Sequence, residues 1–66
     1  MNEEKWSITY TWHDSEEVWH TASEIVSAEN ICEAIKEVDE YLGDRMERRG
    51  WSDYWITGAN IVPEMH

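Results

Sequence analysis

The stretch KWSITYTW, residues 5–12, decides the fold of this chain. Successive side chains of a β-strand point to opposite faces, so a strand with one buried face shows an apolar residue at every second position. Residues 5–12 have this period of two and predict a strand with one apolar face and one hydroxyl-lined face. The two sets are Trp6, Ile8, Tyr10 and Trp12, and Ser7, Thr9 and Thr11.

A second strand is predicted from Glu17 to Ser27, after turn residues 13–16, because it is rich in Val, Thr and Ile. Its inward face is ambiguous, so either a partner covers the other face or a bulge switches the faces midway. Glu24 shares its parity with apolar residues and would be awkward in a core, so we favour a bulge or a strand end near Glu24. The competing sets are Val18, Ala22 and Val26, and Trp19, Thr21 and Ile25.

A helix is expected to begin at Asn30, a favourable N-cap, and Glu33 three residues later completes a capping-box pattern. Ser27 is the alternative cap. Gly43 weakens the helix by about 1 kcal/mol relative to Ala. The helix therefore bends or stops there, or it continues to Gly50, which then follows its last turn. An apolar seam runs along one side, formed by Ile31, Ala34, Ile35, Val38 and Leu42.

A third strand, Tyr54 to Val62, is predicted before Pro63. The parity of its apolar residues indicates that Trp55 and Ile61 share one face, opposite Tyr54, Ile56 and Val62. A right-handed crossover from the second strand through the helix to the third gives the strand order 2-1-3, with antiparallel neighbours. The predicted fold class is α+β, with one β-β-α-β domain over residues 1–66 and one helix packed on one face of a three-stranded antiparallel sheet.

Composition favours a small folded protein. The chain has 66 residues, a hydrophobic share of 41% and five Trp, and each Trp can bury on the order of 150–250 Å². Cys32 is the single cysteine, and neither a signal peptide nor a membrane span is recognisable, so we expect a cytoplasmic protein. The net charge of -10 argues against nucleic acid or an anionic membrane as a direct ligand.

The acidic residues of the helical region follow a pattern that we name the acidic stripe. At about 100° per residue, six carboxylates fall within roughly 80° of arc. They are Glu29, Glu33, Glu37, Glu40, Asp44 and Glu47. Such a row imitates a nucleic-acid backbone, and small inhibitors from phages and other mobile elements often work in this way. The hypothesis is an anti-defence inhibitor or regulator that binds a basic, nucleic-acid-binding protein. The alternative is a solvated helix face.

A second hypothesis rests on the tryptophans. One helix cannot cover five Trp and three Tyr, so some of these side chains are expected on the uncovered sheet face or at an edge. Trp and Tyr are frequent anchors of protein interfaces. We expect Trp19 and one of Trp51 or Trp55, of which Trp55 is chosen, to serve in this way, in a self-associating, dimeric interaction module.

No residues point to catalysis, a cofactor or a metal. His13 and His20 could meet across the hairpin, but a transition-metal site needs three or four ligands. Cys32 lies in the first helical turn, yet no base is in obvious reach, so it is interpreted as a small buried or half-buried residue. The sequence therefore predicts a protein that is not an enzyme.

Overall fold

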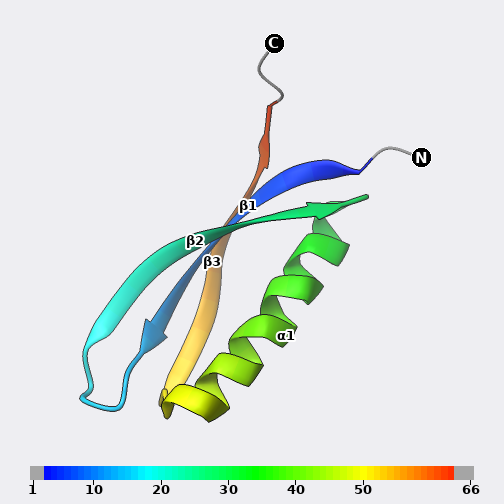
Figure 1. The fold of residues 1–66 in the computed structure, drawn as a ribbon. Helices are drawn as coiled ribbons and strands as arrows, with labels where there is room; N and C mark the ends of the chain where they lie inside the picture. The colour runs from blue at the N-terminus through cyan, green and yellow to red at the C-terminus, as the bar shows by residue number, and fades with distance from the viewer. Residues whose placement is uncertain (1–2, 64–66) are drawn as a thin grey trace.

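The central strand of the sheet is β1 (Glu4–His13), as Figure 1 shows for the computed structural model, which describes residues 3–63. It pairs antiparallel with β2 (Trp19–Ala28) on one side and with β3 (Asp53–Val62) on the other. The helix α1 (Ile31–Arg49) covers one face of the sheet (Figure 1). The predicted α+β class, the β-β-α-β order and the strand order 2-1-3 are confirmed.

The apolar face of β1 forms the centre of the core. Ile8 and Tyr10 are 0% and 4% exposed and belong to one buried cluster with residues of α1. Trp6 and Trp12 pack against the same cluster from the two ends of β1. The buried residues of the helix are Ala34, Val38 and Leu42. The apolar side chains of residues 5–12 therefore face the core, as the sequence predicts.

The turn between β1 and β2 is built around Asp14. Its Oδ1 accepts hydrogen bonds from the backbone N–H groups of Glu16 (2.8 Å) and Val18 (3.0 Å). Glu17 adopts a left-handed backbone conformation with φ of 66°, which lets the chain reverse over these few residues. The turn thus extends to Val18, and β2 begins at Trp19 instead of the expected Glu17.

The expected bulge or strand end near Glu24 is wrong. β2 pairs with β1 without interruption, and Glu24 lies opposite Ile8 on the helix-covered side. The carboxylate is tolerated there because β2 is an edge strand and because the Tyr10 hydroxyl donates a hydrogen bond to it (3.1 Å). The inward parity of β2 is the one that contains Ala22 and Val26.

The bulge occurs instead between β1 and β3. The register shifts between Thr9, which pairs with Gly58, and Tyr10, which pairs with Ile56. The shift leaves one extra residue in β3. Odd-numbered residues of β3 therefore lie on the uncovered side before the bulge and on the helix side after it. Ile61 therefore lies opposite Trp6 on the helix side, whereas Trp55 lies on the other side, and the predicted grouping of Trp55 with Ile61 is wrong.

The caps of α1 confirm the longer of the two predicted helices. Asn30 is the N-cap, and its side chain accepts a hydrogen bond from the backbone N–H of Glu33 (3.0 Å). The helix continues through Gly43. Gly50 follows in a left-handed conformation with φ of 70°, which favours glycine, and its N–H donates to the carbonyl of Met46.

Replacing Gly43 with alanine should stabilise the fold by about 1 kcal/mol, because Gly is a poor residue for a helix interior. A Cβ at this position would lie 3.6 Å from the Tyr54 hydroxyl, an ordinary van der Waals contact. Gly50→Ala is the matched control and should destabilise by about 1 kcal/mol, because its left-handed backbone opposes a side chain. Urea unfolding followed by circular dichroism measures both changes. A less stable Gly43→Ala protein would contradict this description of the helix.

Candidate protein-binding surfaces

The acidic stripe lies on the side of α1 that faces away from the sheet. All six of its carboxylate side chains are exposed: Glu29, Glu33, Glu37, Glu40, Asp44 and Glu47. Glu29 precedes the N-cap, and the other five lie within the helix. At 1.5 Å per residue, the row from Glu33 to Glu47 is about 21 Å long. The structure thus brings the five helical residues of the stripe onto one surface, with Glu29 exposed just before the N-cap, and the role of all six in binding stays a prediction.

Two members of the stripe have contacts within the chain. The Nε of Arg48 lies 3.1 Å from Oδ2 of Asp44, and both side chains are largely exposed, so the pair adds at most about 1 kcal/mol. Glu33 accepts a weak hydrogen bond from the backbone N–H of Glu29 (3.4 Å), which resembles the expected capping box. Among residues 3–63, Asp44 is the one stripe carboxylate with a cationic side chain within ion-pair distance.

A groove between β2 and α1 borders the stripe. It has a volume of about 220 Å³ and is lined by Glu24, Val26, Glu37, Val38 and Tyr41. Glu37 belongs to both the stripe and the groove, so the acidic surface continues from the helix toward the sheet. The guanidinium of Arg45 lies 4.8 Å from the centre of the Tyr41 ring, a cation–π contact. The sequence did not predict this groove, because the inward direction of Glu24 depends on the β1–β2 register.

The other side of the sheet, which α1 leaves uncovered, is here named the open face. It consists of the odd-numbered residues of β1 from Lys5 to His13 and their cross-strand partners in β2 and β3. Thr9 pairs with Ser23 through a hydroxyl–hydroxyl hydrogen bond (3.0 Å), and Thr11 pairs with Thr21 in the same way (3.2 Å). The middle of the open face therefore contains two pairs of hydroxyl groups that bond to each other across β1 and β2.

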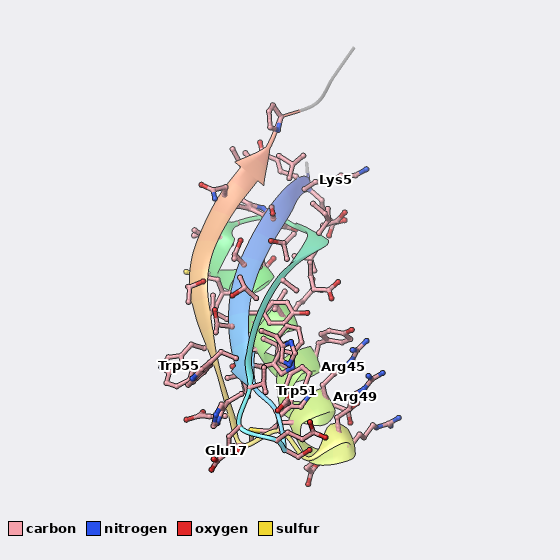
Figure 2. All side chains as sticks on the ribbon, turned by 90° about the vertical axis from the view of Figure 1, so that its left-hand side faces the viewer. Lys5, Glu17, Arg45, Arg49, Trp51 and Trp55 are labelled. Carbon is pink, nitrogen blue, oxygen red and sulfur yellow. The ribbon has the colours of Figure 1, made fainter. Side chains whose placement is uncertain are left out.

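Aromatic side chains gather at the hairpin end of the open face. Trp19 and Trp55 are 51% and 49% exposed, and their ring centres lie 4.9 Å apart. His13 stacks on Trp19 with 4.5 Å between ring centres. Figure 2 shows Trp55 on the opposite side of the ribbon from Trp51, which is half-buried and stacks on Trp12. Trp19 and Trp55 thus lie on the uncovered face, where the sequence places interface anchors.

The considered pairing of His13 with His20 is wrong. Trp12 is the β1 partner of His20, so the two histidines point to opposite faces of the sheet. The Nε2 of His20 lies 2.6 Å from Oδ2 of Asp14. This hydrogen bond, followed by the one from the Val18 backbone N–H, lowers the pKa of Asp14. No group of three or more metal-binding side chains occurs over residues 3–63.

Cys32 is exposed, so the expectation of a small buried or half-buried residue is wrong. Its position in the first turn of α1 turns its side chain away from the seam of Ala34 and Val38, which faces the sheet.

Across the described part of the chain, no helix combines the length and the apolar character needed to cross a membrane.

Comparison with known proteins gives no relative of this chain. No protein-family model, no curated protein and no solved structure matches it significantly. The function of this chain is therefore inferred from the surfaces described above.

The contact between Tyr10 and Glu24 should make stability depend on alkaline pH. Burial, followed by the hydrogen bond to the Glu24 carboxylate, raises the pKa of Tyr10 to about 12. In the unfolded chain, the pKa of this hydroxyl is about 10. The contribution of Tyr10 to the free energy of unfolding is thus complete below about pH 10 and declines from there to about pH 12.

Urea unfolding at several pH values between about 8 and about 11 tests this dependence. Tyr10→Phe should lower stability by about 1 kcal/mol at neutral pH and should lose less stability than the wild type as the pH rises. Tyr54→Phe is a parallel test, because burial and the Asp39 carboxylate also raise the pKa of Tyr54, and it too should lose less stability than the wild type as the pH rises. Parallel curves for Tyr10→Phe and the wild type would contradict the proposed contact.

Proposed function

We propose that this chain is a non-enzymatic, acidic protein-binding module that occupies the nucleic-acid-binding surface of a basic protein and so inhibits or regulates it. One observation carries the proposal: five exposed carboxylates form a row on the outward side of α1, with exposed Glu29 just before the N-cap, and of these six only Asp44 has an ion-pair partner over residues 3–63. Arg and Lys side chains that bind phosphate groups can bind carboxylates by the same charge-assisted hydrogen bonds. An anti-defence protein of a phage or another mobile element would have these properties.

The charge density of the stripe supports such an imitation. The five helical carboxylates follow one another at about 5 Å along the axis, against about 3.4 Å per phosphate along one strand of B-DNA. The stripe thus has roughly two-thirds of the linear charge density of one strand. Like charges three and four residues apart cost a helix a few tenths of a kcal/mol per pair, a cost that opposite charges at these positions would remove. A protein that needs only solubility has no reason to retain this cost.

Exposed charges accelerate association and select partners more than they add affinity. The groove beside the stripe provides contacts of another kind. A guanidinium group between Glu24 and Glu37 would place its methylene stem against Val26 and Tyr41, so that charge and apolar surface are matched at once. The groove therefore suits an arginine side chain of the partner better than a small cation.

Charge reversal on the stripe tests the proposal. Glu37→Lys with Glu40→Lys should reduce capture of basic, nucleic-acid-binding proteins from a bacterial lysate at least about tenfold, because the contact then becomes repulsive. Proteins captured by the wild type should leave between roughly 0.1 and 0.5 M salt, where exposed charges are screened. Mass spectrometry of each salt step gives the measurement. Glu33 is left intact because of its contact with the backbone N–H of Glu29.

A matched control separates the stripe from net charge. Glu16→Lys with Glu17→Lys places the same replacements at the hairpin turn, which lies outside the stripe. Each Glu→Lys change adds two charges, so both double variants carry -6 instead of -10. The control should capture the same proteins as the wild type. Equal capture by both variants would overturn the stripe as the binding surface.

A further inference from the structure

The charged residues of this protein are distributed unevenly between its two faces. The chain has 15 acidic residues, yet Asp53 is the only one among the described residues of the open face, where Lys5 offsets it. The open face is thus nearly neutral in a protein of net charge -10. A strongly acidic protein repels its own copies through most of its surface. The open face is the surface where this repulsion is weakest.

The same face contains the largest exposed apolar side chains of the sheet. Trp19, Trp55 and Ile25 are 51%, 49% and 58% exposed, and the first two are in contact with each other. Burying an unpaired hydroxyl is costly, but a hydroxyl that already has a partner can leave water at lower cost. The Thr9–Ser23 and Thr11–Thr21 hydrogen bonds provide such partners in advance. The chemistry of the open face therefore suits contact with another uncharged sheet.

We propose that the open face binds the open face of a second copy of this chain, with Trp19 and Trp55 in the contact. The two sheets would pack face to face, and each helix with its acidic stripe would point outward. This arrangement keeps the two stripes on opposite sides of the dimer, where their mutual repulsion is weakest. The proposal stands independently of the function assigned to the stripe.

The size of the open face limits the area that a dimer can bury. Three strands of ten residues give a footprint of about 33 by about 14 Å, or about 900 to 1,000 Å² for the two copies together. Stable complexes bury about 1,200–2,000 Å², and interfaces below this range belong to weak, transient contacts. We therefore expect a weak dimer in exchange with the monomer.

Sedimentation equilibrium of the full chain over a range of concentrations tests the proposal. The mass should rise with concentration from 7.9 kDa toward twice that value. Added salt should leave the association unchanged or strengthen it, because salt screens the remaining repulsion. Trp55→Ala should weaken association at least about fivefold, and Ser23→Glu should abolish it by placing like charges across the two-fold axis. Ser15→Glu, in the hairpin turn, is the matched control and should associate like the wild type.

Dilution experiments by NMR locate the contact even where a variant loses stability. Amide signals of Thr9, Thr11, Thr21 and Ser23 should shift between concentrated and dilute wild-type protein, while those of the stripe should stay constant. A 7.9 kDa species at every concentration would overturn the proposal. So would concentration-dependent shifts on the outward side of α1, or association that Ser23→Glu leaves unchanged.

Discussion

The alternation of β1 is the constraint on which the rest of the structure depends. β1 is the central strand and pairs with both neighbours along its length, so its period of two decides what each side of the sheet contains. Ile8 and Tyr10 lie on the side that packs against α1, and the Ser and Thr residues of β1 lie on the opposite side. With a single helix over residues 3–63, the second side stays uncovered (Figure 1). Two chemically different surfaces are the consequence.

Each of these two surfaces has its own proposed binding role. The outward side of α1 carries exposed carboxylates that suit a cationic partner, and Glu24 and Glu37 extend this surface into the groove beside β2. The open face carries paired hydroxyls with Trp19 and Trp55 at one end. Binding at either surface leaves the other accessible. A dimer formed through the open face would present two acidic stripes, which doubles the surface that a basic partner can meet.

Much of the fold could be predicted because its signals are local. The period of residues 5–12, the Asn30 cap and the Gly50 terminus depend on neighbours in the sequence, and the strand order follows from the handedness of the crossover. The acidic stripe could be predicted for the same reason, since helical spacing alone places its residues on one side.

The features that could not be predicted depend on register between strands. Glu24 faces inward because it lies opposite Ile8, and it is tolerated there because the Tyr10 hydroxyl donates a hydrogen bond to it. Both neighbours are known only once β1 and β2 are aligned. The bulge between β1 and β3 moves Ile61 to the helix side, although parity in the sequence groups it with Trp55. The separation of His13 from His20 has the same origin, because adjacent rows of a sheet point to opposite faces.

The most direct test of the proposed division is an NMR titration of the full chain with a hexa-arginine peptide. We predict saturable shifts for residues of the stripe and the groove, foremost Glu37, Glu40 and Tyr41, and no shifts for Thr11 or Thr21 of the open face. Added salt should reverse these shifts, because exposed charges make the contact. Shifts of equal size at Glu16 and Glu17 in the hairpin turn would contradict a specific acidic surface, because the peptide would then respond only to net charge.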